Sequence, residues 1–148
     1  MPASILSCLY AFIACLGFSL VFNLRGWKIL TASLGGALGW LVFLLSTPVL
    51  NDLLQYFLAT LVLSIYAEIL ARVQKAPVIT FQIVAILPLV PGSGIYRTME
   101  LAISGNTSAF LETGLHTLAI AGSLSLGILL VSTLARLGSR VLRRAGAR

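Results

Sequence analysis

Charge is what this sequence has least of. Only 9% of its 148 residues are charged, whereas a soluble domain carries roughly 25% charged residues. With 59% hydrophobic residues and a mean hydropathy of +1.04, the chain lacks the polar surface that would enclose a soluble globule of this size. These figures exclude a soluble domain and predict one integral membrane domain over residues 1–148.

Histidine and cysteine are scarce too. Cys8 and Cys15 lie in one apolar run, where a helix separates them by roughly 10 Å, beyond the reach of a disulfide. We therefore predict free thiols. With His116 as the only histidine, we expect no metal site, no cofactor and, since catalytic clusters are lacking, no enzyme. His116 follows Glu112 by one helical turn and is expected to form a surface pair with it.

The ten basic residues outnumber the four acidic ones and give a net charge of +6. Such an excess can indicate nucleic-acid binding, but half of these basic residues lie at the C-terminus, directly after an apolar run. This distribution is typical of a cytoplasmic segment that flanks a membrane helix. Anionic membrane lipids are therefore the expected partner, and nucleic acid is not.

The few charges divide the chain into apolar segments long enough to cross a bilayer, which takes about 20 residues. Five such segments cover residues 4–23, 29–50, 53–71, 78–96 and 113–135, and a basic tail follows at 136–148. The predicted fold class is all-α, a polytopic membrane helix bundle with about five transmembrane helices, of which the fourth is broken at Pro88–Gly94.

Basic residues alternate between the loops that join these segments. They occur in the first loop, the third loop and the tail, while the second loop has none and the fourth has Arg97 beside two acidic residues. Because basic loops stay in the cytoplasm, this pattern predicts a multi-pass protein with its N-terminus outside and its C-terminus in the cytoplasm.

Small residues recur at helical spacing in two of the segments. The second segment has Gly35 and Gly39, and the fifth has Ala119, Ser123 and Gly127. Small residues four positions apart let helix backbones approach closely in lipid. The spacing fits ordinary packing within the chain, and it fits a seam along which helices slide during transport.

Two prolines and two glycines interrupt the fourth segment: Pro88, Pro91, Gly92 and Gly94. Proline removes a backbone donor, and glycine tolerates conformations that other residues resist. We therefore expect the helix to break here, with a short helix following at 95–104.

A break at membrane depth is tolerated where it is buried in protein or lines a wet cavity. The free amides around Gly92 and the Ser93 hydroxyl are then candidates for binding a solute carboxylate. A turn at the membrane surface or a plain kink is the alternative. Tyr96 and Arg97 follow the break on the outer side, where Tyr96 is a candidate for the substrate path and equally for an interfacial anchor.

Two further polar sites lie within the apolar segments. Glu68 precedes Arg72 by one turn on the same helix face, and a carboxylate in a membrane is costly enough to suggest a function. Proton coupling or gating is one interpretation of the pair, and an interfacial ion pair is the other. Gln82 precedes the break by two turns and is expected either to hydrogen-bond another helix or to contact substrate.

Three stretches carry a family resemblance: AFIACLGFSLVFN at Ala11–Asn23, Ala-Arg-x-x-Lys-x-Pro at Ala71–Pro77 and ILPLVPGSGIYRTM at Ile86–Met99. They resemble the small subunit of the threonine/serine exporter (ThrE-type) family. The resemblance implies a bacterial inner-membrane carrier that exports small hydrophilic metabolites, threonine and serine among them, driven by the proton-motive force.

In that family the module is either fused to a larger membrane subunit or separate from it, and this chain has the length of the split form. The resemblance therefore implies a larger subunit of the same family as partner, in a homo- or hetero-oligomer. Some split members of the family are linked to dicarboxylate export, for example of succinate. Dicarboxylates therefore remain an alternative class of substrate. A structural subunit that supports a partner carrier without contacting substrate is the other alternative.

Overall fold

The computed structural model describes the backbone of residues 2–145 and the side chains of residues 5–139. Within this part of the chain all regular structure is helical, which confirms the predicted all-α class. The elements are α1 (Pro2–Val21), α2 (Trp27–Ser46), α3 (Asp52–Val73), α4 (Val78–Ile86), the 3₁₀ turn η1 (Leu87–Leu89), α5 (Gly92–Ile103) and α6 (Thr107–Ala145).

Three of these helices, α2, α3 and α6, are long and apolar enough to cross a membrane. The segment from α4 to α5 passes the same test as a pair bent by 55°. The chain is therefore a multi-pass membrane protein with up to four spans of this kind. The described apolar stretch of α1, Ile5–Val21, is shorter, so the crossing predicted at residues 4–23 stays a prediction.

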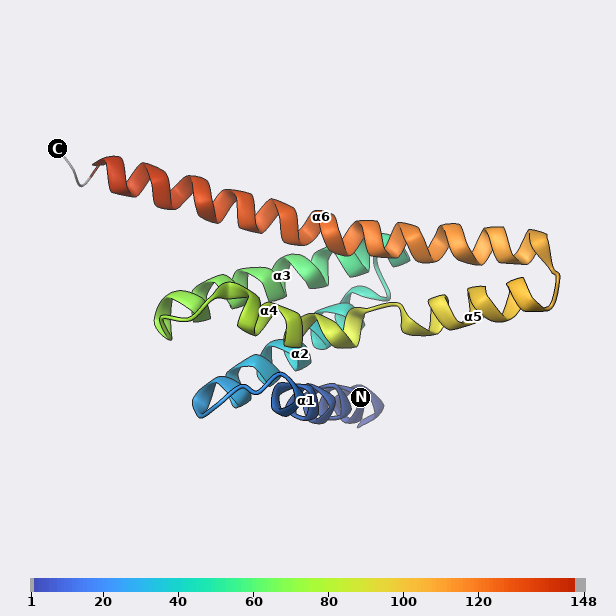
Figure 1. Ribbon diagram of the computed structural model, residues 1–148, viewed down its shortest axis with the longest axis horizontal. Coiled ribbons are helices and arrows are strands. Elements are labelled where there is room, and N and C mark those ends of the chain that lie inside the picture. The colour runs from blue at the N-terminus through green and yellow to red at the C-terminus, as the bar shows by residue number, and fades with distance from the viewer. Residues whose placement is uncertain (1, 146–148) are drawn as a thin grey trace.

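The centre of the molecule lies where α2 meets its neighbours (Figure 1). α2 packs against α1, α3 and α4, while α6 packs against α3 and α5. Small buried side chains such as Cys15, Ala32 and Ala67 allow these close contacts around the larger Phe81. Cys15 donates a hydrogen bond to the Val84 carbonyl at 3.3 Å. Both cysteines are free, as predicted.

Residues with positive φ close the turns at one end. Asn23 and Gly26 have φ values of 56° and 65° in the α1–α2 turn, and Lys75 has a φ of 47° in the α3–α4 turn. Glycine adopts this region freely and asparagine more readily than most residues. These two turns and the adjoining parts of α2, α3 and α6 carry five basic residues that we call the basic end: Arg25, Lys28, Arg72, Lys75 and Arg136.

Glu68 lies beside Arg72 near the basic end, and the other ionisable acidic and basic side chains of the described region lie at the opposite end. The α2–α3 turn and the α5–α6 hairpin carry three of the four acidic residues. We call the set Asp52, Arg97, Glu100, Glu112 and His116 the acidic end.

α6 is longer than the sequence predicted. The segment expected at 113–135 is part of one helix of 39 residues, about 58 Å at 1.5 Å per residue. Asn106 starts it early, because its side-chain oxygen accepts from the Ala109 amide at 3.3 Å. A lone Gly138 costs only about 1 kcal/mol in a helix, so the helix continues into the predicted tail as far as Ala145, and residues 146–148 lie outside the described part.

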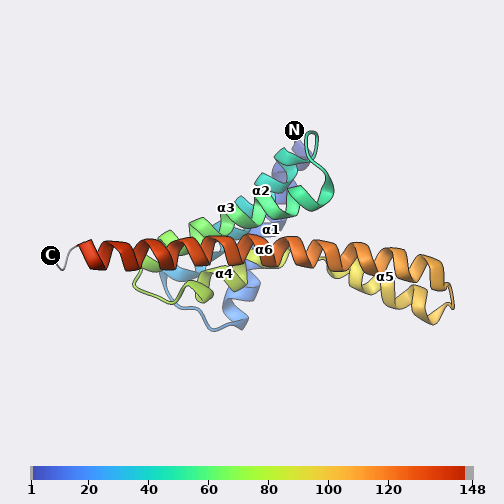
Figure 2. The same ribbon diagram turned by 90° about the horizontal axis from the view of Figure 1, so that it is seen from above.

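The hairpin of α5 and the first turns of α6 projects beyond the other helices in both views (Figures 1 and 2). α5 packs against α6 there. The two helices of the bent pair thus have different surroundings: α4 lies among α1, α2 and α3, and α5 lies along α6.

Candidate functional site

The predicted break between α4 and α5 is confirmed and is narrower than Pro88–Gly94. Pro88 lies inside η1, and only Val90 and Pro91 lie outside helical elements. Pro91 is buried and has no backbone N–H. The regular pattern of backbone hydrogen bonds in a helix therefore cannot continue through it. The Gly92 amide instead donates to the Val90 carbonyl at 2.7 Å, and the Ile95 amide to the Pro91 carbonyl at 3.1 Å.

The two glycines after the break have ordinary helical conformations in the first turn of α5. A side chain at Gly92 would meet open space, and its φ is not positive. The expectation that Gly92 holds a conformation other residues resist is therefore wrong. Gly94 is the sterically constrained position, because a Cβ there would lie 2.6 Å from Thr117 Oγ1 on α6.

The remaining predicted residues of α5 are exposed. Ser93, Tyr96 and Arg97 all have exposed side chains. Arg97 lines a cavity of about 520 Å³ between α5 and α6, together with Glu112 and His116. This acidic-end cavity was not predicted, since its two walls come from segments that the sequence separates by a turn.

Gln82 is not among the residues that line the acidic-end cavity. Its Nε2 donates to Ser64 Oγ on α3 at 3.2 Å, which is the interhelical bond expected from the sequence. The Gln82 side chain also lines an open cavity of about 540 Å³ between α3, α4 and α6, which we call the basic-end cavity. The structure therefore places Gln82 and Arg97 at two different hollows.

Glu68 and Arg72 line the same basic-end cavity. Their predicted pairing is present, with Arg72 Nη2 at 3.9 Å from Glu68 Oε2. That separation is at the long limit for an ion pair, and Arg72 is 60% exposed while Glu68 is 19% exposed. A pair with one exposed partner contributes little to stability. Because the contact with Arg72 is so long, the half-buried Glu68 carboxylate can still accept hydrogen bonds.

α6 supplies the third wall with side chains that the sequence analysis did not assign to a site. Ser132, Arg136 and Ser139 all line the basic-end cavity. Their spacing of four and then three residues places them on one face of a helix. That spacing was a signal in the sequence, but it became informative only when α6 was known to run as a helix past residue 135.

A third hollow of about 450 Å³ lies on the other side of α4. Asn23, Arg25 and Lys28 line it from the α1–α2 turn, and Ile79 borders both this hollow and the basic-end cavity. It contains basic side chains but no acidic one. We call it the cationic cavity.

The glycines of the predicted packing stripes lie at contacts within the chain. A Cβ on Gly35 would lie 2.9 Å from Tyr66, and one on Gly39 would lie 3.2 Å from Leu63, both on α3. A Cβ on Gly127 would lie 3.0 Å from the Cβ of Thr60. Ala119 and Ser123 are half-buried on α6, the same helix as Gly127.

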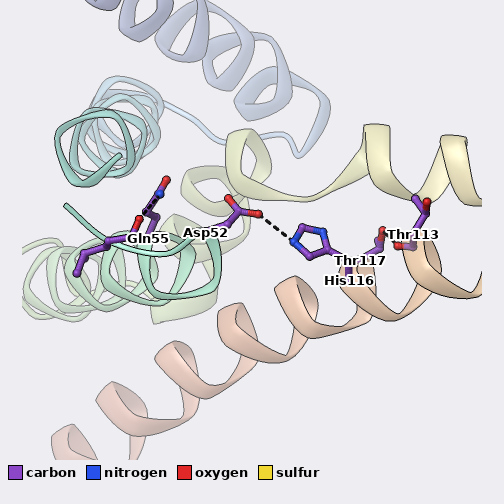
Figure 3. A network of polar contacts seen from close by, with 6 residues as sticks. Asp52, Gln55, Thr113, His116 and Thr117 are labelled. Carbon is purple, nitrogen blue, oxygen red and sulfur yellow. Dashed lines mark hydrogen bonds and ion pairs between the residues drawn. The ribbon is translucent and has the colours of Figure 1, made fainter. Parts of the chain in front are cut away.

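His116 forms a different pair from the one expected. Its Nε2 lies 3.3 Å from Asp52 Oδ2 at the start of α3, not beside Glu112. Figure 3 shows the two side chains pointing towards each other across the gap between α3 and α6. Nearby, Gln55 donates to the Leu50 carbonyl at 2.7 Å and so fixes the α2–α3 turn. The expected Glu112 pair is wrong because a residue distant in sequence is closer in space.

No group of three His, Cys, Asp or Glu side chains in the described region is arranged to hold a metal ion. The polar side chains of the three hollows are carboxylates, guanidinium groups, an ammonium group, an imidazole, amides and hydroxyls. These groups bind and release polar solutes by hydrogen bonds and charge.

Apolar helices of spanning length, together with a segment bent at a proline and hollows near both ends, define a polytopic membrane protein. The chain belongs to the threonine/serine exporter (ThrE) family, whose family model matches residues 7–134. The resemblance seen in the sequence is thereby confirmed, and the role is membrane transport of the exporter type. No curated protein and no solved structure gives a significant match.

Proposed function

We propose that this protein is the membrane subunit of a secondary exporter that moves threonine and serine out of the cell, driven by the proton-motive force. Family membership over residues 7–134 carries the proposal. The bend between α4 and α5 supports it, because broken helices expose backbone groups to polar solutes at membrane depth.

The solute path in this proposal follows the bent span. Gln82 lies before the bend and Ser93 after it, with exposed polar side chains continuing to Arg97. The break residues Pro88 and Pro91 hold the two halves at their angle, and Gly94 sets the approach of α5 to α6. Glu68 with Arg72 is proposed to couple proton movement to solute movement or to gate the path. The proposed path residues are Gln82, Pro88, Pro91, Gly92, Ser93, Gly94, Tyr96 and Arg97.

The protein is proposed to lie in a bacterial inner membrane with the basic end in the cytoplasm, the N-terminus outside and the C-terminus inside. The charge asymmetry supports this orientation, because basic residues are retained on the cytoplasmic side. Anionic lipid headgroups would contact the same end.

A larger subunit of the same family is the proposed partner. Gly35, Gly39 and Gly127 already contact helices of this chain. A partner must therefore use other surfaces, in a hetero-oligomer or in a larger assembly with several copies of each chain.

Proteoliposomes that contain the chain, the larger subunit or both test this proposal. We expect threonine efflux to require both proteins and an imposed proton gradient, and to stop when a protonophore collapses the gradient. Succinate efflux in place of threonine efflux would favour the dicarboxylate alternative. Efflux by the larger subunit alone would leave this chain a structural subunit and contradict the proposal.

A further inference from the structure

We infer that the basic-end cavity is a binding site for a small zwitterion, with Glu68 binding its ammonium group and Arg136, assisted by Arg72, binding its carboxylate. The inference rests on the proposed export function and adds to it where the solute first binds and which charges select it.

The charge composition of the cavity is the first observation. Glu68 is the only acidic side chain among the lining residues, and it shares the lining with two guanidinium groups, that of Arg72 on the same helix and that of Arg136 on α6. Guanidinium groups pair with carboxylates in a planar, two-pronged geometry. One carboxylate and two guanidinium groups therefore offer a site for each charge of a zwitterion.

The incomplete pairing of Glu68 is the second observation. Its side chain is 19% exposed, and its ion pair with Arg72 is 3.9 Å long. A carboxylate can accept about four hydrogen bonds, and burial without partners is costly. An ammonium group in the cavity would satisfy this acceptor and would leave Arg72 free to turn towards the solute carboxylate.

The cavity also offers neutral hydrogen-bonding groups and enough room. Gln82, Ser132 and Ser139 add an amide and two hydroxyls to the lining. These groups suit the side-chain hydroxyl of a hydroxyamino acid. The volume of about 540 Å³ lies within the range of roughly 300–1,000 Å³ that is usual for small-molecule sites.

The cationic cavity and the acidic-end cavity lack this combination. The cationic cavity has Arg25 and Lys28 but no acidic residue. The acidic-end cavity has Arg97 and Glu112, but its carboxylate is exposed, whereas that of Glu68 is half-buried. A dicarboxylate fits the basic-end cavity poorly, because its second carboxylate would be repelled by Glu68.

Equilibrium binding of radiolabelled L-threonine to the purified full chain in lipid nanodiscs tests the site. Three competitors separate the charges: 3-hydroxybutanoate lacks the ammonium group, 1-amino-2-propanol lacks the carboxylate, and succinate has two carboxylates. We expect threonine to bind and each competitor to bind at least about tenfold more weakly, since a charge-assisted hydrogen bond is worth that much.

Two substitutions test the assigned roles. Glu68→Gln should weaken threonine binding about tenfold and should remove most of the preference for threonine over 3-hydroxybutanoate, because the ammonium partner is lost. Arg136→Gln should instead remove the preference over 1-amino-2-propanol. Arg136 is exposed, so this variant is expected to fold. Arg25→Gln, a charge loss at the same end in the cationic cavity, is the matched control and should bind threonine normally.

The outcomes separate this site from the export function. Unchanged binding and selectivity in Glu68→Gln and Arg136→Gln would overturn the inference while leaving export by the wild-type complex intact. Tighter binding of succinate than of threonine, or no threonine binding to the wild-type chain, would overturn it as well. Selective threonine binding that follows these two residues would support the site even if the assembled complex transported nothing, an outcome that contradicts the proposed export function alone.

Discussion

Asp52 at the start of α3 and His116 on α6 form a contact of 3.3 Å between two helices that are far apart in sequence. The contact lies where α6 leaves the body of the molecule and continues with α5 as a projecting hairpin (Figures 1 and 3). It joins the hairpin to the rest of the helix bundle at the end opposite the basic-end cavity.

A double-mutant cycle with Asp52→Asn and His116→Gln measures this contact. The side chains of Asp52 and His116 are 45% and 55% exposed, so solvent screens their interaction, and we expect a coupling free energy below about 1 kcal/mol. Thermal unfolding in detergent gives the stability changes of the two single variants and of the double variant. Additive effects of the two substitutions would show that the contact does not hold the hairpin.

The two glycines at the start of α5 should respond differently to alanine. Gly94→Ala places a Cβ 2.6 Å from Thr117 Oγ1, and overpacking of this kind costs about 1–3 kcal/mol. Gly92→Ala meets open space and should be neutral or slightly stabilising. Export in cells and the melting temperature of the purified variants are the measurements.

Thr117→Ala provides the control for that pair, because it removes the atoms that a side chain at position 94 would strike. The double variant Gly94→Ala/Thr117→Ala should regain most of the stability that Gly94→Ala loses. Equal stability of Gly92→Ala and Gly94→Ala would contradict the close approach of α5 to α6 at Gly94.

Gly127→Leu on α6 should destabilise the isolated chain. A Cβ there lies 3.0 Å from Thr60 and 3.3 Å from the Phe57 carbonyl oxygen, and backbone atoms cannot move aside cheaply. Gly122→Leu, on the same helix with open space around it, is the matched control. Size-exclusion chromatography after heating should show earlier loss of Gly127→Leu. If Gly127→Leu were stable alone and defective only with a partner, the glycine would belong to an intersubunit contact.

The orientation can be tested by labelling introduced cysteines in intact cells. Ser139→Cys lies towards the C-terminal end of α6 and Asn106→Cys lies in the α5–α6 turn, and position 106 is exposed. If the basic end is cytoplasmic, a membrane-impermeant maleimide should label position 106 and not position 139. Variants in a background with Cys8 and Cys15 replaced by serine exclude labelling of the native thiols. Labelling of both positions from one side contradicts the proposed topology.

The sequence determined the features that depend on neighbouring residues. Low charge with apolar runs of about 20 residues fixes an all-helical membrane protein, because a helix of that length spans the bilayer and satisfies its own backbone groups in lipid. Pro88 and Pro91 fix the bend, since proline cannot continue the bond pattern. The Glu68–Arg72 pair follows from helical spacing. The composition of the α1–α2 turn and α3–α4 turn likewise fixes which helix ends are basic.

Only the tertiary structure decided which distant residues meet. His116 pairs with Asp52 and not with Glu112. The steric constraint lies at Gly94 and not at Gly92. The face of α6 that carries Arg136 lines the same cavity as Glu68 and Gln82. These relations depend on the angles at which α3, α4 and α6 pack. Residue spacing sets the face of a helix on which a side chain lies, but the partner of that face is set by packing against helices elsewhere in the chain.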